Sequence, residues 1–406
     1  MIQPHSSKNS SFSRLLAFRI LVVLAYQVIA VVAGWHIYEL SRDPLSLGLV
    51  GLAEIVPYFC MALFAGHAID RHSRKLFGVA SCLLLVLNAL MLAGVSDGII
   101  PGNPVIWIYG AIAIGGVARA FIGPTYSAMF AQVLPRSGYA RGAAAGSTVF
   151  QLGLVAGPAL GGIMTASIGK TASYAVAAVF GLGAAAVLLS IRTEARAPAE
   201  NSPMISSIVE GLRFVRNNRI VLGAQMLDMF AVLFGGAVSL LPAFVQDVFS
   251  TGPETLGLLR AAPALGGMAT GIMLSRCPIS RNNGHWMLGT VAGFGICIIG
   301  FALSGDLLTA AMFLLLSGIC DGVSMVTRTT IIQLVTPDAM RGRVAAINGI
   351  FIGSSNELGA FESGLAARFL GLVPSVVFGG VMTLIVVGVT GWFAPELRRL
   401  DLKQLD

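Results

Sequence analysis

Apolar runs long enough to cross a lipid bilayer recur along the whole chain, and they constrain its fold more than any other feature. A helix of roughly 18 or more apolar residues spans the ~30 Å of hydrocarbon in a membrane. Backbone groups in lipid must pair within a helix or a closed barrel, and these runs lack the alternation typical of strands. The chain is 56% hydrophobic and only 11% charged, which is too little charge for a soluble surface. We therefore predict an all-helical membrane protein.

The predicted spans fall into two sets of six around a polar segment. We expect them at residues 14–40, 45–66, 76–95, 104–133, 142–166, 171–191, 220–249, 254–276, 286–304, 306–335, 343–370 and 374–394. The polar segment at 192–219 then links an N-terminal bundle, 1–191, to a C-terminal bundle, 220–406. The predicted fold class is an all-α membrane protein with twelve transmembrane helices in two pseudo-symmetric six-helix bundles.

The polar segment contains residues at helical spacing. Ile208, Leu212 and Val215 recur on one face, and Glu210 and Arg213 lie on others. This pattern predicts an amphipathic helix on the inner membrane surface. A solvated tether with one helical turn fits the same residues, so both interpretations stay open.

Lysine and arginine are distributed unevenly between the two sides of the predicted membrane. With the N-terminus inside, only Arg42, Lys170 and Arg368 lie outside, and the other basic loop residues face the cytoplasm. We therefore predict a multi-pass protein of the bacterial cytoplasmic (inner) membrane with both termini cytoplasmic. The net charge of +7 reflects this topology signal and gives no reason to expect nucleic acid as a partner.

The two halves of the chain match each other at a fixed offset of 202 residues. The matched pairs are Pro135 with Pro337, Arg141 with Arg343, Gly157 with Gly359, Gly162 with Gly364, Gly169 with Gly371, and Arg119 with Asp321. A run of matches at one offset indicates duplication. Duplicated membrane halves place a shared site near the middle of the bilayer and rock about it.

Five charged residues lie far from the ends of their predicted spans: Glu54, Arg119, Asp228, Asp321 and Glu357. An ionisable group at the bilayer centre costs at least ~2.5–3.5 kcal/mol, so it faces a cavity or a partner. A carboxylate whose basic partner comes and goes with conformation would bind and release a proton. We predict that these five side chains form the substrate and proton path. The alternative for each acid is a fixed structural ion pair between helices.

The stretch GHAIDRHSRK at residues 66–75 lies between the second and third predicted spans. It resembles the loop signature of the major facilitator superfamily, with Ser73 in place of the usual glycine. In that family the loop latches the two halves on the cytoplasmic side. The resemblance implies the major facilitator fold. It also leads us to expect a cytoplasmic gate at Gly66, Asp70, Arg71, Arg74, Arg141 and Arg343.

The fifth predicted span contains the stretch GLVAGPALGG at residues 153–162. It resembles the antiporter motif of the same superfamily, which marks exporters. The motif residues are Gly153, Gly157, Pro158, Gly161 and Gly162. Glycines spaced by four leave one helix face bare, so a neighbouring helix can approach closely, and the proline removes a backbone hydrogen bond. Tight packing without directional meaning is the alternative interpretation.

Two further stretches extend the resemblance over essentially the whole chain. RAFIG at residues 119–123 is similar to the arginine motif of proton antiporters, with Ile122 in place of the usual glutamine. TPDAMRGRV at residues 336–344 resembles the bacterial exporter branch that includes the enterobactin exporters. Export of a siderophore-like or drug-like molecule is the function that this resemblance implies.

The sequence therefore predicts a proton-coupled exporter of a small organic molecule that works by alternating access. Its expected partners are the small-molecule substrate, protons and the lipid bilayer, and we expect a monomer. No cofactor and no metal site are expected, because the five cysteines lack ligand spacing. No nucleotide-binding or catalytic motif suggests an enzyme. Two alternatives stay open: a lysophospholipid or lipid flippase, and a divalent-metal exporter similar to bacterial ferroportins.

Overall fold

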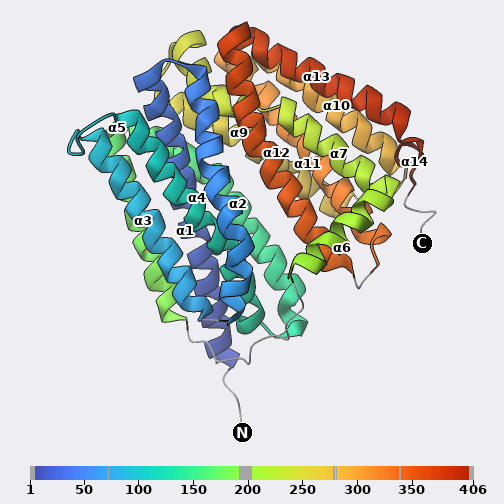
Figure 1. Cartoon of the computed structure of the whole chain (residues 1–406), viewed down its shortest axis with the longest axis horizontal. Coiled ribbons are helices and arrows are strands. Elements are labelled where there is room, and N and C mark those ends of the chain that lie inside the picture. The colour runs from blue at the N-terminus through green and yellow to red at the C-terminus, as the bar shows by residue number, and fades with distance from the viewer. Residues whose placement is uncertain are drawn as a thin grey trace. The chain divides into compact units, whose positions relative to one another are not determined.

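The computed structural model describes residues 5–71, 73–191, 204–277, 279, 281–337 and 340–401, and their regular structure is helical throughout (Figure 1). The long helices are α1 (His5–Ser41), α2 (Pro44–Arg71), α3 (Arg74–Ser96), α4 (Pro104–Val133), α5 (Tyr139–Ser190), α6 (Met204–Asn217), α7 (Arg219–Phe234), α9 (Pro253–Arg276), α10 (Asn283–Ala302), α11 (Leu307–Val335), α12 (Arg341–Leu370) and α13 (Leu372–Phe393). The short helix α14 (Pro395–Arg398) follows α13.

Ten stretches of the described residues are long and apolar enough to cross a membrane. One of them is the 52-residue α5, which contains two predicted spans. These two spans are joined at Gly169, where the backbone is not helical. The other predicted span without a separate match is α12, whose apolar character is diluted by Glu357, Glu362 and several serine and asparagine residues. Each of the twelve predicted spans therefore corresponds to helical structure in the described chain.

The bend within α5 recurs in the second half of the chain. Gly169 has φ 84° and ψ 171°, and Gly371 has φ 91° and ψ 162°. Both conformations are open to glycine and strained for other residues. Since the two glycines are 202 residues apart, the predicted duplication extends to the backbone of the fifth-to-sixth span connection.

The predicted span at 220–249 matches the membrane-crossing stretch Arg219–Val248, but this stretch is not one continuous α-helix. Helix α7 ends at Phe234, and a 3₁₀ turn (Ala237–Leu240), the short α8 (Leu241–Ala243) and a π-helical turn (Phe244–Val248) follow it. The α-helix breaks at Gly235 and Gly236, because glycine has a low helix propensity. A side chain at Gly235 would also clash with the Phe294 ring.

Contacts within the chain define two compact units, which we describe separately. The first contains residues 1–42, 52–200 and 251–261. In it α1 packs on α5 and α4, and α3 packs on α4 and α5 (Figure 1). Two basic side chains donate hydrogen bonds to carbonyl groups at the C-terminal end of α5. Arg14 donates to the Ser190 carbonyl at 2.8 Å and Lys75 to the Ile191 carbonyl at 3.1 Å, which complements the negative end of the helix dipole.

The second unit contains residues 43–51, 201–250 and 262–406. Here α10 packs on α11 and α13, and α7 packs on α12 and α13 (Figure 1). Helices α9 and α11 cross so closely that a Cβ added at Gly318 would clash with the Pro263 backbone. Small residues at such crossings let helices gain van der Waals contact in lipid, where burial between helices brings no hydrophobic gain.

The linker prediction falls partly outside the described residues, which omit 192–203. Residues 204–217 form helix α6. Its Val215 is 1% exposed and packs in a cluster with Ile332, Val344 and Ile347, whereas Leu212 is exposed. The apolar face of α6 is thus partly covered by α11 and α12. Its position on the membrane surface, and the division of the chain at 192–219, stay predictions.

Replacing Gly169 or Gly371 with alanine should destabilise the protein by about 1–3 kcal/mol, because the backbone there is strained for any residue with a Cβ. Thermal unfolding of the purified protein in detergent measures this loss. Gly110 of α4 is the matched control. A Cβ there would have no neighbour within 4 Å, so alanine should be neutral or stabilising. Equal unfolding midpoints for all three variants would contradict the argument.

Candidate functional site

Three side chains from three helices form a hydrogen-bonded cluster in the first unit. Tyr26 of α1 donates to Glu54 Oε1 of α2 at 2.7 Å. Arg119 of α4 donates to the same oxygen at 2.6 Å and to the Tyr26 hydroxyl at 3.0 Å. The Glu54 side chain is 11% exposed and that of Arg119 is 37% exposed. Arg119 and Glu54, both predicted from sequence, are therefore brought together as an ion pair.

Two tyrosine rings flank the Arg119 guanidinium. Its central carbon lies 5.2 Å from the centroid of the Tyr26 ring and 5.6 Å from that of Tyr58. A guanidinium over an aromatic face is attracted by the ring quadrupole, and the attraction grows as water is excluded. The two rings thus help the carboxylate of Glu54 to hold the guanidinium in place.

A second ion pair lies in the second unit. Arg328 of α11 donates a hydrogen bond to the Asp228 carboxylate of α7. The two side chains are only 4% and 7% exposed, respectively. The sequence analysis placed Asp228 in the path but did not name Arg328, so the partner of this acid was missed. The available signal was the spacing of Asp321 and Arg328, two turns apart on one helix face.

Asp321 lies next to this ion pair. Asp228, Asp321 and Ser324 line the same small recess, together with Phe294 of α10. The described residues place no basic group within ion-pair distance of Asp321, whereas Asp228 has Arg328. The second cluster therefore contains two carboxylates and one guanidinium, and only Asp228 is paired with the guanidinium.

Several buried polar atoms around this second cluster have no hydrogen-bond partner among the described residues. They are both amide atoms of Gln225, the Ser324 hydroxyl and Arg328 Nε. Gln225 lies one turn before Asp228 on α7, and Ser324 one turn before Arg328 on α11. Buried polar groups without partners are rare in folded proteins and mark places where an ion, water or ligand binds.

The two clusters occupy equivalent positions in the duplicated halves. The offset of 202 residues relates Tyr26 to Asp228 and Arg119 to Asp321, and it also relates Tyr126 to Arg328. Helix α1 therefore corresponds to α7, and α4 corresponds to α11, although the charges at the matched positions differ. This correspondence could have directed attention to Tyr26 from the sequence alone.

The remaining predicted path residue, Glu357, lies half-buried on α12. The structure collects the other four predicted residues into two clusters, Glu54 with Arg119 in the first unit and Asp228 with Asp321 in the second.

The glycine-rich segment of α5 packs against α1. A Cβ added at Gly153 would lie 2.5 Å from Val23 Cγ1, and one at Gly157 would lie 2.5 Å from Gln27 Cβ. Gly161 faces Val28 in the same way. The predicted bare face is thus a site of close helix approach. Pro158 lies buried within α5, and Gly162 contacts Gly257 of the same unit.

The predicted cytoplasmic gate is only partly described. The structure describes only the backbone of Gly66, Asp70 and Arg71. Arg74 is the first residue of α3, and Arg141 is exposed in the first turn of α5. The remaining member, Arg343, pairs with Glu210 of the linker helix α6 at 2.6 Å. This pair is largely solvent-exposed, so it contributes little to stability, and the role of the gate stays a prediction.

Two related helical halves with charged residues at corresponding positions of their helices are typical of a secondary transporter. The family model of the Major Facilitator Superfamily matches residues 15–360. The chain belongs to the Major Facilitator Superfamily: it is a multi-pass membrane transporter and not an enzyme, with the predicted fold of twelve helices.

Relatives and solved structures agree with this assignment. The chain is 27% identical over 404 residues to the multidrug efflux pump Tap of Mycolicibacterium fortuitum, covering 96% of this chain and 97% of Tap. It is 24% identical over 410 residues to the enterobactin exporter EntS of Citrobacter koseri, covering 96% and 93%. The crystal structure of a bacterial homolog of the human lysosomal transporter Spinster superimposes with a TM-score of 0.75 at 16% identity, covering 99% of both chains. The predicted resemblance to bacterial exporters is confirmed.

Replacing Asp228 with leucine should cost about 3–5 kcal/mol of stability, because Arg328 would remain buried without its partner. The double variant Asp228→Leu/Arg328→Leu should recover most of this loss, since no charge is then left in the interior. Thermal unfolding of the single and double variants in detergent measures the difference. A double variant as unstable as the sum of its single changes would show that the two side chains do not interact.

Replacing Gly157 with alanine should destabilise the protein by about 1–3 kcal/mol, because the added methyl group overpacks the α1–α5 contact at Gln27. Gly183→Ala on the same helix is the control. Its Cβ would lie 3.5 Å from Leu21, an ordinary contact, and alanine favours the helix. Unfolding midpoints that rank the two variants the other way would contradict the packing argument.

Proposed function

We propose that this transporter exports a small organic molecule, drug-like or siderophore-like, in exchange for protons. The observation that carries the proposal is the carboxylate of Asp321, which lines the same recess as Asp228 of the Asp228–Arg328 ion pair. One of the two acids can be neutralised by the arginine, and the other is neutralised by a proton. The similarity to Tap and EntS over nearly the full length supports export as the direction.

Coupling follows if Arg328 contacts the acids differently in the two states of the transport cycle. An acid that loses its guanidinium partner in low-dielectric surroundings takes up a proton, and it releases the proton when the partner returns. The Arg119–Glu54 ion pair is a second contact that can change between the two states, because Tyr26 and Tyr58 also contact the guanidinium. Alternating access would then move substrate and protons in opposite directions.

We also propose the membrane location and the topology that the sequence predicts. The protein would lie in the cytoplasmic membrane of a bacterium as a monomer, with both termini in the cytoplasm. The excess of lysine and arginine in the loops on one side supports this orientation. The flippase and metal-exporter alternatives have no observation of their own among the described residues.

Proteoliposomes with an imposed pH gradient test the coupling. The wild-type protein should transport a cationic dye or a catecholate siderophore against its gradient and dissipate the pH gradient as it does so. Asp321→Asn should reduce proton-driven transport by roughly tenfold or more, because a neutral amide cannot carry the proton. The pH-sensitive fluorescence of a trapped dye and the uptake of substrate are the two readouts.

The matched control is Glu396→Gln, which removes one acid from an exposed ion pair with Arg219. It should transport as the wild-type protein does, and both variants should keep the wild-type unfolding midpoint. Transport that proceeds equally with and without the pH gradient, or an Asp321→Asn variant with unchanged coupling, would refute proton exchange.

A further inference from the structure

A groove of about 610 Å³ lies between α7 and α13 of the second unit. The two helices pack against each other along it (Figure 1). Its volume is in the range of a small-molecule site. None of the residues assigned to the charge clusters, the gate or the glycine-rich helix lines this groove. It is therefore separate from the transport path.

The walls of the groove are apolar stripes on two membrane-spanning helices. Each stripe repeats at every fourth position, and its members are Leu222, Met226 and Phe230 on α7 and Ile385, Val389 and Phe393 on α13. Ile385 and Val389 are 49% and 50% exposed. Apolar surface that is exposed on a membrane-spanning helix faces the acyl chains of lipid rather than water. The walls are thus suited to hold a hydrocarbon chain.

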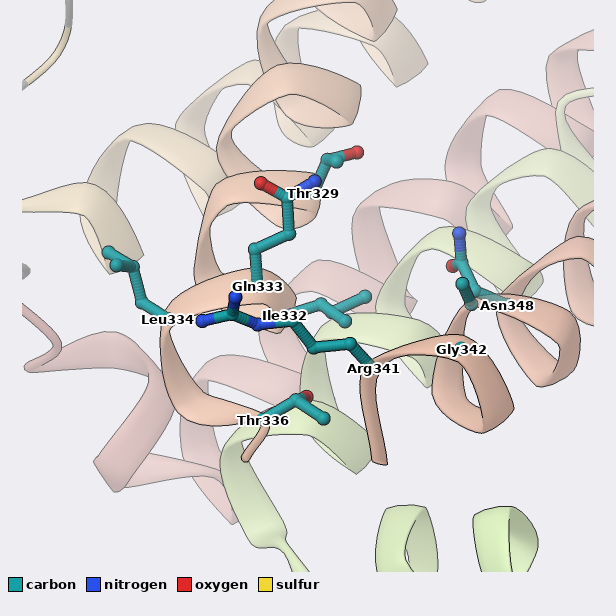
Figure 2. A pocket seen from close by; sticks show the side chains of 9 residues that line it. Thr329, Ile332, Gln333, Leu334, Thr336, Arg341, Gly342 and Asn348 are labelled. Carbon is teal, nitrogen blue, oxygen red and sulfur yellow. The ribbon is translucent and has the colours of Figure 1, made fainter. Parts of the chain in front are cut away.

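Another pocket of the second unit shows the contrast. It has about 590 Å³, lies where α11 ends and α12 begins, and is lined by the polar side chains of Thr329, Gln333 and Asn348, among others (Figure 2). In the groove between α7 and α13, the charged residues instead lie at one end. The groove therefore suits a long apolar chain that has a charged group at one end.

The charged end of the groove lies at the level of the membrane surface. Arg219 is the first residue of α7, and Glu396 lies in α14, just after the apolar stretch of α13 ends at Phe393. Trp392, beside this end, is 80% exposed. Exposed tryptophan and arginine are typical of helix ends at the lipid headgroups. From Arg219 to Phe234 the wall is roughly 22 Å long, enough to cross the ~15 Å of hydrocarbon in one leaflet.

The two charges at this end are paired with each other and still face outward. Arg219 Nη1 donates to Glu396 Oε1 at 3.1 Å, and the side chains are 81% and 41% exposed. A guanidinium has several further N–H donors and a carboxylate has a second oxygen, so this single hydrogen bond leaves both groups able to bind more. A backbone hydrogen bond at Glu396, together with the one from Arg219, lowers the pKa of the Glu396 carboxyl, which is therefore charged at neutral pH.

We propose that the groove binds one molecule of phosphatidylethanolamine, with an acyl chain between α7 and α13. Its phosphate accepts hydrogen bonds from Arg219, and its primary ammonium donates to Glu396, so each charge of the headgroup meets one of opposite sign. Phosphatidylcholine has no N–H on its ammonium group, and phosphatidylglycerol has no positive charge. Neither can donate an ammonium hydrogen bond to Glu396. The proposal does not depend on proton exchange or on the exported substrate.

Native mass spectrometry of the full-length protein tests this selection. The protein is purified in detergent and incubated with equal amounts of dioleoyl phosphatidylethanolamine, phosphatidylcholine and phosphatidylglycerol. The wild-type protein should retain one phosphatidylethanolamine, by about tenfold over each of the other lipids, which is the factor expected for one charge-assisted hydrogen bond. Equal retention of the three lipids, a preference for either of the other two, or no retention would overturn the proposal.

Substitutions at the charged end separate the two contacts. Arg219→Gln should lower the retention of all three lipids by about tenfold, since each has a phosphate. Glu396→Gln should remove the preference for phosphatidylethanolamine and keep the retention of phosphatidylcholine. Because the groove is separate from the transport path, Glu396→Gln should change lipid retention alone. Glu210→Gln, in an exposed ion pair with Arg343 outside the groove, is the control and should select lipids as the wild-type protein does. Equal loss of preference in both glutamate variants would contradict the assigned headgroup contacts.

A substitution within the groove tests the acyl-chain contact. Val389→Trp places a large side chain between the two walls and should lower the retention of every lipid by about tenfold, because it competes with the chain for space. Val381→Trp is the control, since Val381 is 42% exposed on the same helix and lies outside the groove. Equal unfolding midpoints of the two variants without lipid would show that both are folded. Equal lipid retention by the two variants would overturn the assignment of the groove.

Discussion

The cost of placing a charge in hydrocarbon is the constraint on which the rest of this structure depends. Asp228 and Arg328 are almost fully buried, and each is tolerated only because the other is present. Their pairing determines how α7 and α11 face each other, since a rotation of either helix would leave one charge alone. In the first unit, Glu54 and Arg119 impose the same requirement on α2 and α4.

Close helix packing supplies the rigidity that these ion pairs need. Gly153 and Gly157 let α5 approach α1, and Gly318 lets α11 approach α9. Each contact places backbone against side chain or backbone at van der Waals distance, which is the main attraction available between helices in lipid. Hydrogen-bonded charges can be held within a fraction of an ångström only on elements that do not shift.

Duplication explains why the two charge clusters lie at corresponding positions. The same offset that relates Gly169 to Gly371 also relates Arg119 to Asp321 and Tyr26 to Asp228. The backbone has been kept and the chemistry has diverged: one half has an arginine where the other has an aspartate. The two halves therefore carry different charges at corresponding positions of their helices.

The sequence by itself determined the helical class, the number of spans, the duplicated halves and the superfamily, because these follow from hydropathy, length and motif spacing. The sequence also identified Glu54, Arg119, Asp228 and Asp321 as charged residues within spans, since a charge in an apolar run can be recognised from the sequence alone. The partners of these charges were decided only by tertiary structure. Whether the Arg328 side chain turns toward Asp228 depends on the rotation and crossing of helices α7 and α11. Those follow from side-chain packing over many residues, which spacing along the chain does not encode.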